Sequence, residues 1–481
     1  MPNRLRVLWR ARRYGFGMLV SRGPQVPYSG IKIASARHER HELVRDSTAL
    51  ATSLRPSAIE AVILALFCIS AAIQWNDGAL ARAALAYVTV GMLACIWGLQ
   101  SKTLRLRWIV PWAVLLYEIQ ALLRSLPTVD RGIWTAFHIA IWAAAALGIA
   151  ACSLRNLRAR RAALIAAVAG FFICGALLIR SGHRPSVDVW DLHQQASKAL
   201  WSGSNPYKIR TRDIYSPEYS RKFYGPGMSL GGYLTVGYPY PPISLFLSSL
   251  GYVAAGDYRY AHLVLICLSA LMLGYSGAGA ISSMGATLFL FCPRVLLVLE
   301  NGWSEPTIVF LFALVVFCRQ RFPRLAPWTT GLLLTGKQYM IFTAPAVLRR
   351  WRDVPKAALA GLLVTAPLML WDVREFLNSA VFFHFAQPTR PDALSYMAAL
   401  MRYNIHLPGW VPFGLTVAAW LYVLRRSPRT TSEICIATSL LLLVFFMFNK
   451  SAFCNYYYLV ICTLGGAIAT LEPAGVRDQT S

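Results

Sequence analysis

Apolar stretches recur along almost the whole chain and are separated by short polar, often basic, connections. A helix needs roughly 20 apolar residues to cross about 30 Å of hydrocarbon. Five such spans are predicted before the first long polar segment, near residues 58–75, 79–99, 108–124, 133–153 and 162–179. Later apolar runs lie near 241–256, 259–276, 279–299, 303–318, 325–348, 357–372, 410–424, 432–449 and 455–471. We therefore expect an all-α, polytopic membrane protein with about 12–14 membrane segments.

The short basic connections predict how these spans are oriented. Lys and Arg collect in the cytoplasmic loops of membrane proteins. The connection 101–107 carries three of them and 155–161 carries four, whereas 76–78 carries none. We therefore expect residues 1–56, with eleven Lys or Arg, to form a basic, poorly ordered cytoplasmic arm. Five crossings then place the polar loop 180–240 on the outer side of the membrane.

Three later basic clusters should also lie on the cytoplasmic side. If each apolar run crossed the membrane once, the clusters would not all be on that side. These clusters are 319–324, 349–356 and 425–429. Two apolar runs are therefore predicted to turn back within the membrane as pairs of half-helices. One is 325–348, broken at Gly336-Lys337-Gln338, and the other is 279–299, broken at Cys292-Pro293-Arg294. Broken helices at membrane depth are tolerated only where they line a cavity or are buried in protein, so the breaks indicate a candidate site.

Composition supports the membrane assignment and excludes a soluble protein of ordinary type. The 481 residues are 56% hydrophobic and 14% charged, with a formal net charge of +26. In a soluble protein this charge would suggest nucleic acid, but cytoplasmic loops and anionic lipid head groups explain it better here. The ten cysteines lie in or beside apolar runs without C-x-x-C spacing. We interpret them as buried small hydrophobes and predict neither a disulfide framework nor a metal site.

The outer loop contains a predicted amphipathic helix, with apolar residues at 192, 196, 199 and 200 and a stop at Gly203. Asp188 and Asp191 lie at its amino end. A carboxylate at the membrane surface could accept a proton from an incoming hydroxyl group, so both are catalytic candidates. A purely structural role as a helix cap remains an alternative, and it suits Asp191 better than Asp188.

Lys337 lies at the predicted break of the run 325–348, and that run contains no Asp or Glu. A lysine at membrane depth usually binds something, and an anionic lipid phosphate is the expected partner. Replacement by methionine should then leave the empty protein as stable as before, or slightly more stable. The alternative is that Lys337 reaches an interface or pairs with a structural acid.

Several motifs occur together in a distinctive order. They are Asp188, Gly203-Ser-Asn-Pro-Tyr207, Gly237-Tyr-Pro-Tyr-Pro-Pro242 before an apolar span, Asn301-Gly302, Lys337, and Lys450 followed by Asn455-Tyr-Tyr-Tyr458. In this order and spacing the chain resembles the polyprenyl-phosphate-dependent membrane glycosyltransferases of the GT-C fold, specifically glycosyltransferase family 87. The resemblance covers about residues 162–471. Four additional spans, within 57–161, precede it, and residues 472–481 are expected to form a cytoplasmic tail.

The resemblance implies a reaction and assigns roles to residues. Such enzymes move a sugar from a lipid phosphate to a hydroxyl of a lipid or glycan acceptor on the outer face. Asp188, or else Asp191, would be the general base, and no cofactor or metal would be required. Lys337, Arg390 and Lys450 would contact the donor phosphate. The other substrate-binding candidates are Tyr207, Tyr240, His384, Asn455 and Tyr456.

Some of these residues could have purely structural roles, and other functions are possible. Arg390 could be a solvated loop charge, and the aromatic run that follows Asn455 could be an interfacial belt. A transporter or flippase of lipid-linked saccharides would also need broken helices and buried cations. A third possibility is a noncatalytic subunit of an envelope assembly machine. We expect a location in the bacterial inner membrane, with the site on the outer side and membrane lipids as further partners.

Overall fold

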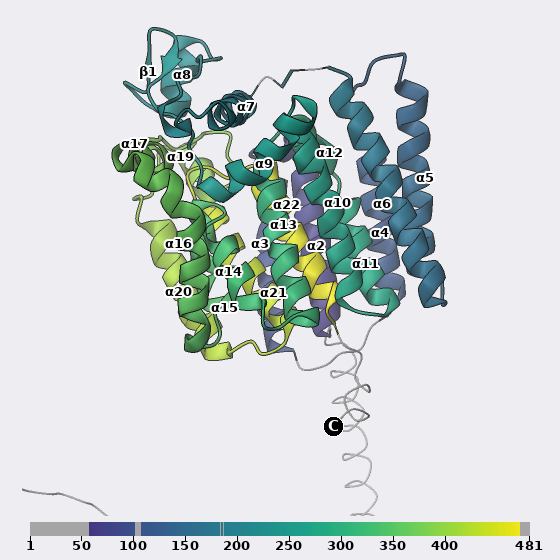
Figure 1. Ribbon diagram of the computed structural model, residues 1–481. Helices are drawn as coiled ribbons and strands as arrows, with labels where there is room; N and C mark the ends of the chain where they lie inside the picture. The colour runs from purple at the N-terminus through teal and green to yellow at the C-terminus, as the bar shows by residue number, and fades with distance from the viewer. Residues whose placement is uncertain (1–56, 102–106, 183, 186, 472–481) are drawn as a thin grey trace, which may run out of the picture. The chain divides into compact units, whose positions relative to one another are not determined.

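A computed structural model describes residues 57–101, 107–182, 184–185 and 187–471 as parts of one compact unit that begins at Pro56. The predicted arm 1–56 and the tail 472–481 lie outside the described residues. The described chain is a helical bundle with one β-hairpin of two two-residue strands, which confirms the all-α prediction (Figure 1). Seven described helices are long and apolar enough to cross a membrane: Ala58–Gly78, Arg82–Gln100, Trp134–Ser153, Leu157–Arg180, Arg259–Ser276, Trp351–Trp371 and Thr431–Phe448.

The first part of the chain forms five antiparallel helices. These are α2 (Ala58–Gln74), which a tight turn η1 (Trp75–Gly78) joins to α3 (Arg82–Gln100), then α4 (Ile109–Arg124), α5 (Trp134–Ser153) and α6 (Leu157–Arg180). A capping box between Ser57 and Glu60 starts α2. Because α2 packs against α22 and α3 packs against α21, the four additional helices belong to the same bundle as the rest of the chain.

The polar loop that follows forms a small group of elements at one end of the bundle, which we name the α7 end (Figure 1). They are α7 (Asp188–Trp201), η2 (Pro206–Lys208), α8 (Pro217–Tyr224) and the hairpin of β1 (Ser229–Leu230) and β2 (Tyr233–Leu234), in which Ser229 pairs with Leu234. The predicted amphipathic helix is therefore confirmed as α7. It buries Leu192, Ala196 and Ala199.

The remaining helices complete the bundle. They are α9 (Pro242–Ala255), α10 (Arg259–Ser276), α11 (Ala280–Leu290), α12 (Val295–Glu300), α13 (Glu305–Arg321), α14 (Ala326–Leu334), η3 (Gln338–Thr343), α15 (Ala344–Val347), η4 (Trp351–Asp353) and α16 (Val354–Trp371). A second group at the α7 end follows, with α17 (Val373–Leu377), η5 (Asn378–Phe382), α18 (Phe383–Ala386) and α19 (Tyr396–Met401). The chain ends in α20 (Val411–Arg426), α21 (Thr431–Phe448) and α22 (Cys454–Ala469).

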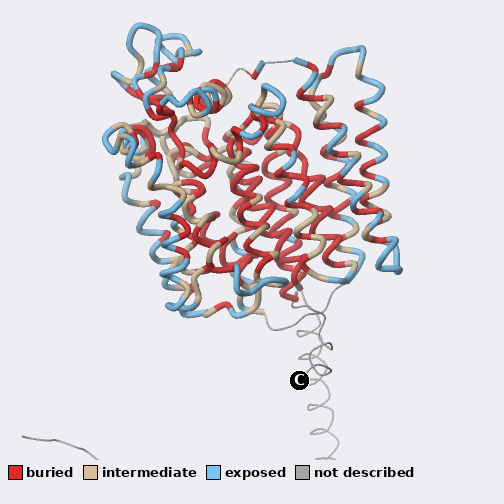
Figure 2. The backbone as a smooth tube through the Cα atoms, in the orientation of Figure 1, coloured by how far each residue is buried: buried red, intermediate tan, exposed pale blue. Residues whose placement is uncertain are grey.

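The core lies along α21 and α22, in the middle of the bundle, where almost every residue is buried (Figure 2). Helices approach closely there through glycine: a Cβ added to Gly285 of α11 would lie 2.4 Å from the carbonyl oxygen of Gly465. Small residues allow such contact between membrane helices. All ten cysteines are buried, as predicted.

The basic clusters gather at the end opposite α7. Arg160 donates to the carbonyl of Ala278, and Arg321 donates to those of Tyr275 and Gly277. Arg349 donates to Ser427 at 2.6 Å. This common end agrees with the predicted orientation, and its assignment to the cytoplasmic side stays a prediction.

The half-helix pair predicted for 325–348 is present. α14 leaves the basic end beside α16, with Gly331 packed on the backbone of Ala357. The chain breaks at Lys337, and η3 with α15 leads it back to the basic end at Arg349.

The prediction of a second pair of half-helices, at 279–299, is wrong. α11 and α12 form one continuous pass, because Ala278 lies beside Arg160 at the basic end whereas the carbonyl of Glu300 accepts from Arg259 at the start of α10. The proline break interrupts the helix without reversing it. The chain reverses instead at α9: Ser244 donates to the carbonyl of Gly336 in the bundle interior. The end of α9 then returns to α7.

Candidate functional site

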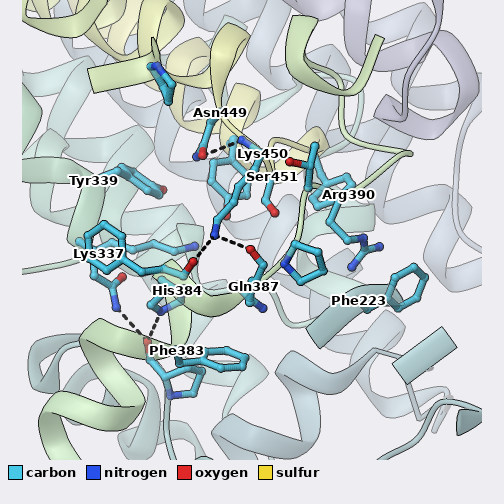
Figure 3. A pocket seen from close by; sticks show the side chains of 18 of the residues that line it. Phe223, Lys337, Tyr339, Phe383, His384, Gln387, Arg390, Asn449, Lys450 and Ser451 are labelled. Atoms are coloured by element: carbon cyan, nitrogen blue, oxygen red, sulfur yellow. Dashed lines mark hydrogen bonds between the residues drawn. The ribbon is translucent and has the colours of Figure 1, made fainter. Parts of the chain in front are cut away.

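A cavity of about 1070 Å³ opens between the two groups of elements at the α7 end and the break at Lys337 (Figure 3). Ligand pockets commonly have volumes of about 300–1,000 Å³. Eight of the ten predicted site residues line the cavity: Asp188, Tyr240, Lys337, His384, Arg390, Lys450, Asn455 and Tyr456. Much of the lining is apolar, and the rings of Phe342, Phe385, Phe413 and Phe445 contact one another to form an apolar flank; Ile341 and Trp410 also line the cavity. The sequence prediction thus brought together residues more than 260 positions apart along the chain.

Asp188 is the first residue of α7 and lies on the cavity wall. Its Oδ2 accepts a hydrogen bond from the Tyr224 hydroxyl at 2.6 Å, and its Oδ1 accepts one from the Val189 N–H at 2.9 Å. Burial raises the pKa of Asp188 above its ordinary value, while the Tyr224 hydrogen bond and the Arg390 charge oppose that rise. A carboxylate with a raised pKa is a stronger proton acceptor.

Asp191 has a different environment and does not line this cavity. It is buried and forms an ion pair with Arg184, whose guanidinium lies 5.1 Å from the centre of the Trp190 ring. It does not cap the helix either, since α7 already begins at Asp188. The ion pair attaches α7 to the chain that leads into it.

Tyr207 also lies behind the cavity wall. Its hydroxyl donates to the carbonyl of Tyr240 at 2.8 Å, and Gly237 packs directly on its backbone. A Cβ on Gly237 would lie 2.2 Å from the Tyr207 carbonyl oxygen, so the position requires glycine. The two sequence motifs that contain Tyr207 and Tyr240 therefore pack against each other and fix the position of Tyr240.

Lys337 already has an anionic partner inside the protein. Its Nζ donates to Oε1 of Glu305, a fully buried residue at the start of α13. Asn455 donates to the other oxygen of Glu305 at 2.7 Å, and the Tyr339 hydroxyl donates to Oε1 at 3.3 Å. The alternative that Lys337 pairs with a structural acid is therefore the one that the structure shows, and the acid comes from another helix rather than from the segment 325–348.

Three tyrosine rings surround the same ammonium group. The Nζ of Lys337 lies 5.0 Å from the ring centre of Tyr240, 5.4 Å from that of Tyr339 and 5.1 Å from that of Tyr456. Each ring face attracts the cation. Lys337 is thus held by one carboxylate and three aromatic rings.

His384 and Gln338 join the second group of elements to the loop before α9. His384 Nε2 donates to the carbonyl of Pro239 at 2.7 Å, and Gln338 donates to the same oxygen at 2.9 Å. Burial lowers the pKa of His384 to about 4. The imidazole is therefore neutral at ordinary pH and acts here as a hydrogen-bond donor.

Lys450 differs from the other two cations. Its Nζ donates to the carbonyls of Phe385, at 3.0 Å, and Gln387 (Figure 3). Among the described residues, no carboxylate lies within ion-pair distance of Lys450. Burial lowers the pKa of Lys450 to about 8. Its charge is therefore the one in the cavity best placed to be neutralised by a bound anion.

Arg390 is partly neutralised. Its guanidinium contacts both carboxylate oxygens of Asp392, at 3.0 and 2.9 Å, and lies 3.7 Å from the centre of the Phe223 ring. The Arg390 N–H donates to the carbonyl of Lys450 at 2.9 Å, so the two cations are coupled through the backbone.

Sequence reasoning missed Glu305 and Tyr224. Glu305 begins an apolar span and is the acid that pairs with Lys337. A search for acids near the ends of other spans would have found it. Tyr224 ends α8 and had no comparable signal. Within the part of the chain that the structure describes, no three His, Cys, Asp or Glu side chains are grouped so as to hold a metal ion.

Comparison with known proteins yields no match to a family model, to a curated protein or to a solved structure. The residues and the geometry of the cavity are therefore the basis for inferring a function.

Proposed function

We propose that the protein is an integral membrane glycosyltransferase of the GT-C type, which transfers a sugar from a polyprenyl phosphate to a hydroxyl group of a lipid or glycan acceptor. One observation carries the proposal. A single cavity combines the Asp188 carboxylate, the lysine Lys450, which has no acidic partner among the described residues, and an apolar flank. These are the groups that a lipid phosphate donor and a hydroxyl acceptor require.

In the proposed reaction, Asp188 accepts the proton of the acceptor hydroxyl. The hydroxyl oxygen then forms a bond to the anomeric carbon of the donor sugar, and the bond from that carbon to the phosphate oxygen breaks. The phosphate leaves with the bonding electrons and gains negative charge. Lys450 stabilises this charge, and Arg390 adds to the positive potential from the neighbouring backbone. Asp188 later returns its proton to water.

The apolar flank suits the lipid chain of such a donor. Phe385 is 68% exposed and Trp410 is 70% exposed, and both line the cavity. An apolar rim open on the side of a membrane protein lets a lipid keep its chain among other lipids while its phosphate enters. The α7 end would then face the outer side of the bacterial inner membrane.

Lys337 has a secondary role in this proposal. Because Glu305 already balances its charge, a phosphate could bind Lys337 only by sharing or replacing that partner. The lysine with its tyrosines forms the inner wall of the cavity, where it contributes shape and a positive edge.

The test is a transfer assay with purified protein in lipid nanodiscs. The donor is a polyprenyl-phosphate hexose labelled in the sugar, and the acceptor is an alkyl glycoside. We expect labelled glycoside and free polyprenyl phosphate in equal amounts. Asp188→Asn should reduce turnover by about a hundredfold or more, the lower range for loss of a general base. Glu218→Gln is the control, since it changes an exposed acid of the same loop.

A companion assay with the protein reconstituted in lipid vesicles distinguishes the transferase from the main alternative, a flippase. A flippase would move the labelled lipid between leaflets of a vesicle and leave its sugar attached. Intact donor on both sides, without release of polyprenyl phosphate, would reject the transferase. A folded Asp188→Asn protein with near-normal transfer would reject the role of Asp188.

A further inference from the structure

The end of the bundle opposite α7 contains a partly buried arginine that has no acidic partner among the described residues. Arg319 lies in the last turn of α13. Its Nε is fully buried and has no hydrogen-bond partner within the described chain. No described carboxylate lies within ion-pair distance of its guanidinium. Buried polar groups are normally hydrogen-bonded and buried charges are normally paired, so this guanidinium indicates a site for an anion.

The environment of Arg319 differs from that of other arginines at the same end. Arg155 and Arg158 are exposed, and Arg321 already donates to two backbone carbonyls. Exposed cations are sufficient to orient membrane helices. Helix orientation therefore explains the exposed arginines, but it does not explain why the Nε of Arg319 is removed from water.

Two further arginines add to the positive charge around Arg319. The charged groups that act most strongly on it are Asp353, Arg350 and Arg349. Three guanidinium groups are thus grouped with one carboxylate, and we name the three arginines the Arg319 cluster. Arg349 also donates to Ser427, whereas Arg350 is exposed. Because a planar guanidinium can form two parallel hydrogen bonds to a phosphate, the cluster is suited to a phosphate group.

Exposed apolar side chains adjoin the Arg319 cluster. Phe322 directly follows α13 and is 52% exposed, and Leu325 is 51% exposed. Trp351, which follows the other two arginines of the cluster, is 78% exposed. The two segments lie at the same end of the bundle, since α14 and α16 pack side by side from their first turns. Tryptophan is enriched at membrane–water interfaces, so these side chains favour a ligand that carries apolar chains as well as a phosphate.

We propose that the Arg319 cluster binds the headgroup phosphate of an anionic phospholipid, whose acyl chains lie against the neighbouring apolar side chains. Three cations against one acid leave an excess of positive charge, which disfavours a headgroup with its own cation, such as choline. Basic pockets between membrane helices are known to bind anionic headgroups. The lipid joins the end of α13 to the connection after α15, and so holds together both ends of the half-helix pair that carries Lys337.

The test measures lipid binding to the full-length protein by native mass spectrometry, with short-chain phosphatidylglycerol and phosphatidylcholine as probes. We expect the wild type to bind phosphatidylglycerol at least about tenfold more tightly than phosphatidylcholine. Arg319→Gln and Arg350→Gln should each remove most of this preference, because loss of a hydrogen bond to a charged group weakens binding about tenfold or more. Arg350 is exposed, so its replacement tests the site even if Arg319→Gln does not fold. Arg158→Gln is the matched control, since it removes an exposed arginine of the same end from α6.

Three results would overturn the proposal. A wild type without preference for phosphatidylglycerol excludes the site, and an equal loss of preference in Arg158→Gln shows only a diffuse attraction of the basic end for anions. Inorganic phosphate that binds as tightly as phosphatidylglycerol excludes a lipid as the ligand. Because none of these measurements involves sugar transfer, a failed transferase assay leaves the lipid site intact.

Discussion

Replacement of Lys337 by methionine should destabilise the protein, although the aliphatic volume is kept. Glu305 is 0% exposed and Lys337 is 4% exposed, so the substitution leaves a carboxylate buried without its cation. Removing one partner of a buried ion pair costs about 3–5 kcal/mol. The hydrogen bonds from Asn455 and Tyr339 remain and favour the charged carboxylate, so the expected loss lies toward the lower part of that range.

The converse substitution, Glu305→Gln, should cost less. Lys337 then keeps the three tyrosine rings, each worth about 0.5–2 kcal/mol, and it lines the cavity, whereas Glu305 does not. The double variant Lys337→Met with Glu305→Gln contains no buried charge at either position. We expect it to be more stable than Lys337→Met alone by about 2 kcal/mol, because a neutral pair avoids the desolvation penalty.

The free energy of unfolding can be measured in mixed micelles by titration with sodium dodecyl sulfate. Lys450→Met is the matched control, since it removes the same group from a lysine whose ammonium donates to two carbonyls of the described chain. Loss of such hydrogen bonds should cost about 1 kcal/mol. Equal stability of Lys337→Met and the wild type would refute the ion-pair argument and restore the interpretation of Lys337 as a cation without a counter-ion.

Three further outcomes follow from the cavity. Lys450 has a pKa of about 8, so its positive charge is lost as pH rises through that value. Binding isotherms at several pH values should show that donor affinity falls above pH 8 in the wild type but not in Lys450→Arg, which stays charged. Tyr224→Phe removes a hydrogen bond that lowers the pKa of Asp188, so the acidic limb of the kcat/KM profile should move to higher pH; an unmoved limb would argue against Asp188 as the base. With the native cysteines removed, an impermeant thiol reagent should label Gln338→Cys only from the α7 side and Arg352→Cys only from the other side; the reverse pattern would invert the proposed topology.

The distribution of basic residues predicted much of the fold because it imposes a physical constraint on every connection. Lys and Arg in short loops must share one side, so the clusters around Arg319, Arg349 and Arg425 required two reversals of the chain. One reversal was located correctly at Lys337. The other was assigned to the proline break at Pro293, but it occurs at α9, whose apolar sequence resembles that of an ordinary span. Charge fixes how many reversals occur, whereas packing decides where they occur.

The sequence predicted most of the residues that line the cavity, but not which of their charges form ion pairs. Motif order brought Asp188, Lys337 and Lys450 together without any knowledge of the helix contacts. Which charges form ion pairs depends on which helices pack together, however. A search limited to the segment around Lys337 could not find Glu305, which lies on another helix. The same limit hid Tyr224, which contacts Asp188 from the end of α8, 36 positions further along the chain.

This pairing changes which cation is suited to bind phosphate. An anion that binds Lys337 must compete with Glu305, and it would bring a second negative charge close to a fully buried carboxylate. An anion that binds Lys450 would displace the neutral carbonyls that contact it in the described part of the chain, and it would stabilise the charged state that burial disfavours. The gain is therefore larger at Lys450, although both lysines line the same cavity. The phosphate role that the sequence assigned most directly to Lys337 thus fits Lys450 better, and Lys337 with Glu305 is better suited to hold the broken helix in place.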